Sequence, residues 1–235
     1  MIPLAPALAP ARRLFAGRRG RLVAAAVVVV LLLAGANLAL KVGPVGTGMV
    51  AGPLVALILL VVARRAGLSW EDLGLARRAL RRGARWAAIA VAAVAAAYAI
   101  GLVAVPGIRA LFLDARYQLD TGTAVVTALV MIPVSTVLLE EVAFRGVLFG
   151  LLHRGRRLVW PFGVSSALFG LWHVLPAVPA SRFETIATVV AVTALLGLLL
   201  CELRRRSGSL LAAVAGHWAA NGLGVLLATA LWQAQ

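Results

Sequence analysis

Two adjacent acids and an arginine lie inside a segment that is otherwise apolar enough to cross a membrane. The acids are Glu140 and Glu141, and Arg145 follows four residues after the second acid. A charged residue at the centre of a spanning helix costs about 3 kcal/mol on insertion scales, so three charges this close need partners or a function. Glu141 and Arg145 share one helix face at this spacing and can form an ion pair. Glu140 points about 100° away from Glu141 and is left free to face the bundle interior.

Two further apolar segments supply polar partners. Each carries a pair of residues four positions apart, Phe169 with His173 and His217 with Asn221. At ~1.5 Å of rise per residue, the polar groups on the three segments lie about 16–24 Å from the nearest arginine clusters. Three helices therefore bring polar groups to a similar depth, which indicates one site.

The residue types suit hydrolysis of a peptide bond. A carboxylate shielded from bulk water becomes a better general base, so Glu140 could take a proton from a water held between it and His173. His217 and Asn221 could then donate hydrogen bonds to the oxyanion that forms on the scissile carbonyl. Three neighbours are expected to support the site by pairing or packing: Glu141, Arg145 and Phe169.

These residues give the chain a resemblance to a known family. It resembles the CAAX protease and bacteriocin-processing (Abi) family of intramembrane proteases, whose motifs are Glu-Glu-xxx-Arg, Phe-xxx-His and His-xxx-Asn on successive core helices. All three motifs match in order within residues 120–225, and the Trp70–Gly74 segment is also similar. By the family's proposed mechanism, Glu140 and His173 would activate water. His217 and Asn221 would form the oxyanion hole.

The composition predicts an all-α, polytopic membrane helix bundle. Of the 235 residues, 63% are apolar, and the mean hydropathy is +1.00. About 20 mostly apolar residues suffice for one crossing. About seven transmembrane helices can be drawn, over residues 22–40, 45–63, 87–105, 122–150, 158–178, 185–203 and 209–232. The expected organisation is a cytoplasmic basic N-terminus (1–21), N-terminal transmembrane helices (22–120) and a catalytic core (121–232).

The basic residues report on orientation. The net charge is +15, but the arginines fall in clusters between the apolar runs, which argues against a nucleic-acid partner. The clusters alternate along the chain and predict a cytoplasmic N-terminus and an outer C-terminus in the cell membrane. An even number of crossings would break this pattern unless one segment is re-entrant. The first run is longer than the apolar core of a signal peptide, so we expect it to be retained.

Residues 67–86 differ from the apolar runs. Ser69 and Asp72 form the pattern of a capping box, which predicts a helix that begins there. The apolar face of this helix would comprise Leu73, Ala76 and Leu80, opposite five arginines. We expect an amphipathic helix lying flat on the cytoplasmic surface, against anionic lipid headgroups.

Three alternatives compete with a metal-free protease. Glu140, His173 and His217 could instead bind zinc as a His₂Glu set, although no His-Glu-x-x-His motif occurs. A rhomboid-like serine protease could use Ser165 with His217, but it would leave the paired acids without a role. The third alternative is a non-catalytic membrane protein, such as an immunity or scaffold protein. The expected partners are membrane lipids and a membrane-associated peptide or protein substrate, and no cofactor is expected.

Overall fold

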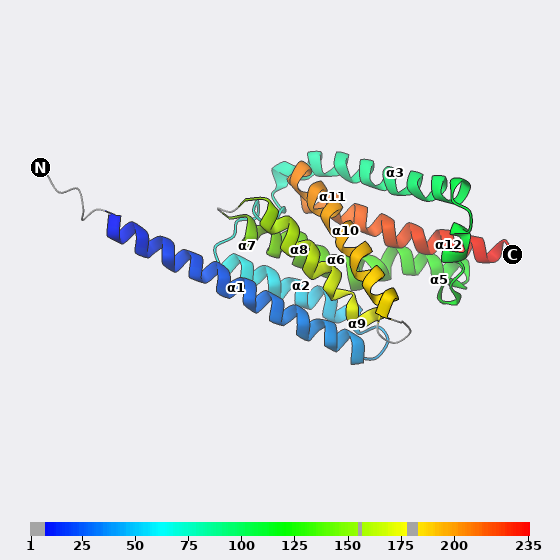
Figure 1. The fold of residues 1–235 in the computed structure, drawn as a ribbon, viewed down its shortest axis with the longest axis horizontal. Helices are drawn as coiled ribbons and strands as arrows, with labels where there is room; N and C mark the ends of the chain where they lie inside the picture. Colours follow the sequence, from blue (N-terminus) through cyan, green and yellow to red (C-terminus); the bar gives the residue numbers. More distant parts are fainter. Residues whose placement is uncertain (1–7, 155–156, 178–182) are drawn as a thin grey trace, which may run out of the picture.

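The chain folds into a bundle of long, closely packed helices (Figure 1). The computed structural model describes residues 8–154, 157–177 and 183–235, and these residues contain no strand. Within these described residues, six helices are long and apolar enough to cross a membrane: Gly20–Val42, Thr47–Arg65, Arg77–Ala104, Thr121–His153, Glu184–Ser207 and Leu210–Gln233. The expected all-α polytopic bundle is confirmed, and the protein is a multi-pass membrane protein.

Four of the long helices are continuous or nearly so, and two are divided into segments. The continuous ones are α1 (Leu8–Val42), α2 (Thr47–Arg65), α3 (Leu80–Ala104) and α10 (Phe183–Ser207). The first segmented helix comprises α5 (Thr121–Val126), η3 (Thr127–Met131), η4 (Pro133–Val137), α6 (Leu138–Glu141), η5 (Val142–Leu148) and α7 (Phe149–His153). The second comprises α11 (Leu210–Trp218), η7 (Ala219–Leu223) and α12 (Gly224–Gln233). Short elements complete the chain: η1 (Arg77–Ala79), α4 (Ile108–Phe112), η2 (Ala115–Tyr117), α8 (Val159–Trp172) and α9 (Val174–Ala177).

The segmented helices contain wide π-helical turns next to the predicted site residues. η5 begins directly after Glu141, and η7 includes Asn221. π-helical turns are often found at functional sites, because they change the direction in which the following side chains point. Pro133 lacks a backbone N–H and begins η4, so it contributes to the departure from regular α-helix there.

The expected crossing at residues 158–178 is shorter than predicted. It is formed by α8, which has 14 residues or about 21 Å of helix, followed by the four-residue α9. Residue 178 lies outside the described residues. Figure 1 shows α8 and α9 running between the same two ends of the bundle as the longer helices, and α1 starts at the end opposite to the one where α12 finishes. The pair is not among the six helices of the described residues that are long and apolar enough to cross a membrane.

The expected interfacial helix is not formed, and that prediction was wrong. The two capping bonds are present: the Ser69 amide donates to Asp72 at 2.6 Å, and the Asp72 amide donates to the Ser69 hydroxyl at 3.1 Å. They close a turn instead of opening a helix, because Gly74 then adopts a positive φ of 75°. Residues 80–86 belong to α3.

Side chains from the rest of the bundle hold this turn in place. Arg154 pairs with Asp72, and Arg204 donates to the backbone carbonyls of Glu71 and Asp72 at 3.1 and 3.0 Å. Leu73 is completely buried beneath them. The segment is thus a packed cap on one end of the bundle and not an independent surface helix.

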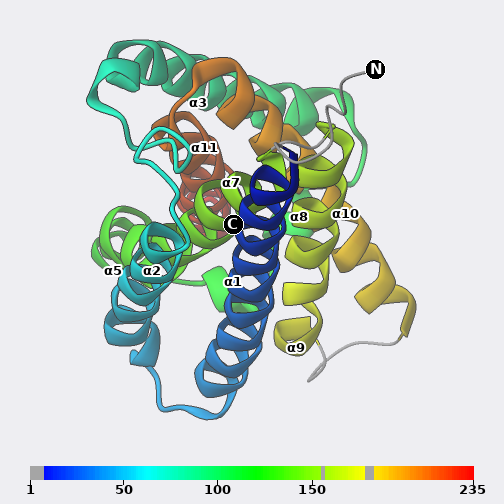
Figure 2. The same ribbon diagram turned by 90° about the vertical axis from the view of Figure 1, so that its left-hand side faces the viewer.

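Helix α1 packs on the bundle through one stripe of residues and continues beyond it (Figure 1). The stripe comprises Ala25, Val29, Leu33, Ala36 and Asn37. Figure 2 shows α1 and α2 on the side of the bundle opposite to α3. The predicted N-terminal segment 1–21 lies partly outside the described residues, and from Leu8 onward it is the start of α1.

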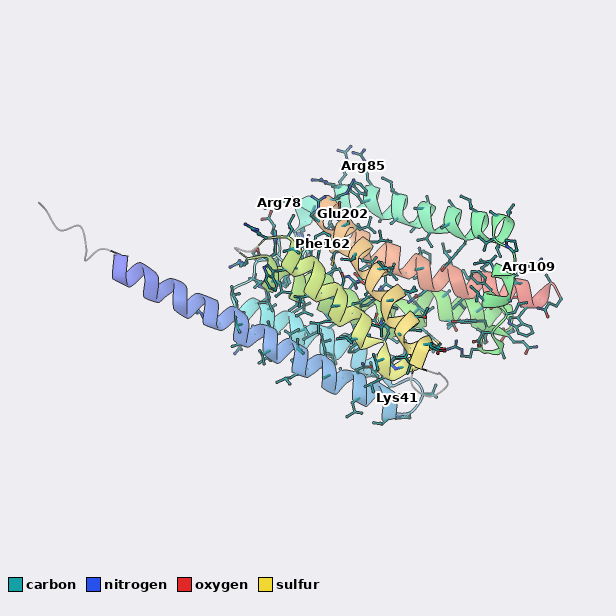
Figure 3. The ribbon with its side chains drawn as sticks, viewed as in Figure 1. Lys41, Arg78, Arg85, Arg109, Phe162 and Glu202 are labelled. Atoms are coloured by element: carbon teal, nitrogen blue, oxygen red, sulfur yellow. The ribbon has the colours of Figure 1, made fainter. Side chains whose placement is uncertain are left out.

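Charged residues mark the two ends of the bundle. Arg78 and Glu202 lie towards one end and Lys41 and Arg109 towards the other (Figure 3). The middle is lined by close helix contacts, such as the one where a Cβ on Gly170 would lie 2.6 Å from the Val190 carbonyl oxygen of α10. Small residues at such contacts let membrane helices approach closely.

Candidate active site

The Glu141 carboxylate joins two helices inside the bundle. Its Oε1 accepts from Arg145 Nη1 at 2.8 Å and lies 2.8 Å from His217 Nδ1. Glu141 and Arg145 are fully buried, and His217 is only 2% exposed. Since an ionised carboxylate only accepts hydrogen bonds, the imidazole is oriented with its Nδ1–H towards Glu141. The ion pair suggested by the sequence is present, but the contact to His217 was missed, because sequence spacing describes neighbours on one helix only.

Glu140 projects into the same interior from the neighbouring position. Its Oε1 accepts a hydrogen bond from the indole of Trp172 at 2.9 Å. Its Oε2 is buried, has no hydrogen-bond partner among the described residues, and lies 3.8 Å from His217 Nε2. Asn221 Nδ2 lies 3.2 Å from that same ring nitrogen. Three of the four predicted catalytic residues therefore meet around His217 Nε2.

His173, the fourth, sits where α8 ends. Its Nδ1 lies 2.8 Å from the backbone carbonyl of Phe169, so Nδ1 carries a proton and Nε2 is left for other partners. Glu140 and His173 both line a cavity of about 470 Å³, together with Asn37, Lys41, Ser135 and Trp172 and several apolar side chains. His217 and Asn221 are not among the lining residues, and His217 Nε2 lies 3.8 Å from Glu140 Oε2. The cavity thus exposes the proposed water-activating pair.

Phe169 does more than pack beside His173, as the sequence suggested. The guanidinium carbon of Arg145 lies 4.0 Å from the centre of the Phe169 ring. The rings of His173 and His217 approach its centre edge to face, at 4.8 and 5.6 Å. Arg145 Nε and Nη2 have no hydrogen-bond partner in the described part of the chain. The stacking on Phe169 therefore supplies a second stabilising contact for this buried cation.

The structure also places the side chains that the two alternative enzyme chemistries would use. Within residues 8–154, 157–177 and 183–235, no three His, Cys, Asp or Glu side chains are grouped closely enough to hold a metal ion. Glu140 Oε1 and His217 Nδ1 are already engaged by Trp172 and Glu141. Ser165, the serine of the rhomboid-like alternative, is fully buried and donates to the Phe144 carbonyl at 2.8 Å.

Comparison with known proteins finds a family to which the segment that carries the site is similar. The family model described as "Type II CAAX prenyl endopeptidase Rce1-like" matches residues 121–223, which carry every predicted site residue. No curated protein matches the chain, and no solved structure does. The resemblance read from the three motifs is confirmed. Residues 121–223 are similar to the Rce1-like, type II CAAX prenyl endopeptidases, a family of membrane-embedded proteases.

Proposed function

We propose that this protein is an intramembrane endopeptidase that hydrolyses a peptide bond of a membrane-associated substrate without a metal ion. The observation that carries the proposal is the free Oε2 of Glu140. This buried oxygen has no hydrogen-bond partner among the described residues, on a carboxylate that lines the same cavity as His173. A buried acceptor without a partner is costly to maintain, so its retention favours a role in chemistry.

The first step assigned to these residues is activation of water. A water between Glu140 and His173 would donate one hydrogen to Glu140 Oε2 and the other to His173 Nε2, whose lone pair is free because Nδ1–H is directed to Phe169. Glu140 would take the proton as the water oxygen attacks the scissile carbonyl. The same carboxyl group would then pass the proton to the leaving amine, which restores the ionised Glu140.

The oxyanion formed in this step requires hydrogen-bond donors. His217 Nε2 donates only when the ring carries a second proton, because Nδ1–H is committed to Glu141. The net charge of the buried cluster is then zero. Glu140 and Glu141 carry one negative charge each, and Arg145 and a doubly protonated His217 carry one positive charge each. Charge balance is what a buried polar cluster requires, and it favours this donor state. An amide nitrogen and a protonated ring nitrogen are both donors and cannot bind each other, so Asn221 Nδ2, 3.2 Å from His217 Nε2, would turn to the oxyanion as the second donor.

The substrate must reach Glu140 through the cavity. The lining is mainly apolar, with Lys41 as its one cationic side chain among the described residues. A peptide with apolar side chains, held near the membrane by its own anchor, suits such a lining. The predicted orientation, with a cytoplasmic N-terminus and an outer C-terminus, forms part of the proposal.

Reconstitution in proteoliposomes tests the proposal, with Glu140→Gln compared with wild type on membrane-tethered peptides. Removal of a general base typically lowers the rate by 10²–10⁴, so we expect cleavage to fall by at least ~100-fold. Glu184→Gln is the matched control, because Glu184 is an exposed acid in the first turn of α10. Equal cleavage by wild type and Glu140→Gln would remove Glu140 from the mechanism.

A further inference from the structure

Helix α8 ends inside the bundle, and its last carbonyl groups need partners. In a regular helix the carbonyl of Trp172 would accept from the amide four residues later, but position 176 is a proline and has no N–H. Asn37 of α1 supplies the missing donor, because its Nδ2 donates to the Trp172 carbonyl oxygen at 2.8 Å. The end of α8 is therefore held by a side chain from the first helix.

The side chain of the same tryptophan holds Glu140. The indole N–H of Trp172 donates to Glu140 Oε1 at 2.9 Å, and both residues are at least nine-tenths buried. One carboxylate oxygen is thus fixed, and Oε2 is the one left near His217 Nε2. The Trp172 ring is also held edge to face against Phe144, with 6.1 Å between ring centres.

Asn37 is a polar residue in an otherwise apolar stripe. It is 8% exposed, and the other buried residues in the part of α1 whose side chains the structure describes are Ala25, Val29, Leu33 and Ala36. An aliphatic residue would pack on the bundle at lower cost, because a buried amide must find partners. The position also lies outside the matched segment 121–223, so the family match does not account for it.

We propose that Asn37 and Trp172 are positioning residues of the active site, and that α1 is thereby a functional part of the protease. Asn37 fixes the backbone at the end of α8, and Trp172 fixes the Glu140 carboxylate with Oε2 towards the reacting water. The inference rests on the proposed function of Glu140. It adds a requirement for the first helix that the three motifs do not contain.

Single variants test the two hydrogen bonds through kcat and KM. Trp172→Phe keeps an aromatic ring and removes the indole N–H. We expect kcat to fall roughly 10- to 100-fold with KM little changed, the range for losing one hydrogen bond to a charged group. Asn37→Leu removes the amide donor at similar volume, and we expect kcat to fall roughly 2- to 10-fold. The control is Leu33→Ala, one turn earlier on the same stripe, which should lower thermal stability and leave kcat unchanged.

A second-site variant tests the role of the missing amide. Pro176→Ala returns a backbone N–H four residues after Trp172, so adding it to Asn37→Leu should restore part of the lost kcat. A packing defect at position 37 would not be corrected by a change at position 176. If Leu33→Ala lowers kcat as much as Asn37→Leu does, or if Trp172→Phe keeps the wild-type kcat, the positioning role is overturned while the Glu140 mechanism stands.

A spectroscopic readout is independent of cleavage. The indole N–H resonance of Trp172, identified by its loss in Trp172→Phe, is followed in ¹⁵N-labelled protein in micelles. We expect it to shift in Glu140→Gln and in Asn37→Leu, and to stay in place in Leu33→Ala. If the chemical shift of the Trp172 indole N–H is unchanged in Glu140→Gln, the indole does not bind the carboxylate. Failure of the proposed function itself would appear differently, as wild-type cleavage that does not depend on Glu140.

Discussion

Replacing Glu141 separates the stability of the buried charge cluster from its catalytic use. Glu141→Leu leaves the fully buried Arg145 guanidinium without its only carboxylate partner among the described residues, and its Nε and Nη2 already lack partners there. Removing one member of a buried pair costs about 3–5 kcal/mol, because a buried charge remains uncompensated. The leucine has a similar volume, so little of this cost comes from a cavity. We expect Glu141→Leu to lose about that much unfolding free energy.

The double variant Glu141→Leu/Arg145→Met removes both charges. Apolar replacement of a whole buried pair is often neutral or stabilising, so most of the loss should be recovered. A residual cost of about 1–3 kcal/mol is expected, because His217 Nδ1–H, which contacts Glu141 Oε1 at 2.8 Å in the wild type, loses its acceptor. Cleavage should stay lost despite the recovered stability, since the Nδ1 contact that sets the orientation and tautomer of the His217 ring is then missing.

Equilibrium unfolding in mixed micelles measures the unfolding free energies of wild type, Glu141→Leu and the double variant, and Arg145→Met is the fourth protein of this double-mutant cycle. Peptide cleavage is followed on the same samples. If the unfolding free energy of Glu141→Leu lies within about 1 kcal/mol of the wild-type value, the reasoning is refuted, because a buried unpaired guanidinium should destabilise the fold by more than that. Strict additivity of the two single changes would also refute it. Restored cleavage in the double variant would show that Glu141 acts only through Arg145.

Three further outcomes are expected. Cleavage should persist after full chelation of metals, because Glu140 Oε1 and His217 Nδ1 are engaged by protein groups, and loss of activity that added zinc restores would contradict this. Gly170→Ala should cost about 1–3 kcal/mol in the same unfolding assay, since its Cβ would lie 2.6 Å from a backbone oxygen of α10, whereas Gly163→Ala has no atom within 4 Å and should be neutral or slightly stabilising. Burial acts to raise the pKa of Asp72, but hydrogen bonds from Arg154 and Ser69 outweigh it and hold the pKa below its ordinary value of 3.8. This group therefore stabilises the fold above about pH 4 and loses its contribution as the pH falls through the lower folded-state pKa, so the melting temperature of wild type should fall more steeply in acid than that of Asp72→Asn.

Much of the fold could be predicted from the sequence because each crossing is a local property. A run of apolar residues long enough to cross a bilayer must satisfy its own backbone hydrogen bonds and becomes a helix. The i, i+4 pairs also follow from local geometry, as the Glu141–Arg145 pair illustrates. The turn at residues 67–76 could have been recognised from Gly67 and Gly74, which both adopt positive φ and leave too little chain between them for a stable helix.

Contacts between helices could not be predicted in this way. The acceptor for His217 Nδ1, the donor to Glu140 and the role of Asn37 all depend on how α1, α8 and α11 pack, and periodicity within one helix carries no information about that. Pro176 did offer a local signal for the break in α8, because a proline removes the amide that Trp172 needs. The π-helical turns changed side-chain directions near the site, and no spacing rule for a regular helix anticipates them.

The way in which His173 caps its own helix has a consequence for covalent labelling. Turning the imidazole over would take Nδ1–H away from the carbonyl of Phe169, a fully buried residue, and a buried acceptor that loses its partner is costly. The two ring nitrogens are therefore chemically unequal, with one facing protein and the other available to the cavity. A histidine-directed electrophile that enters from the membrane should form a single regioisomer on His173, at Nε2.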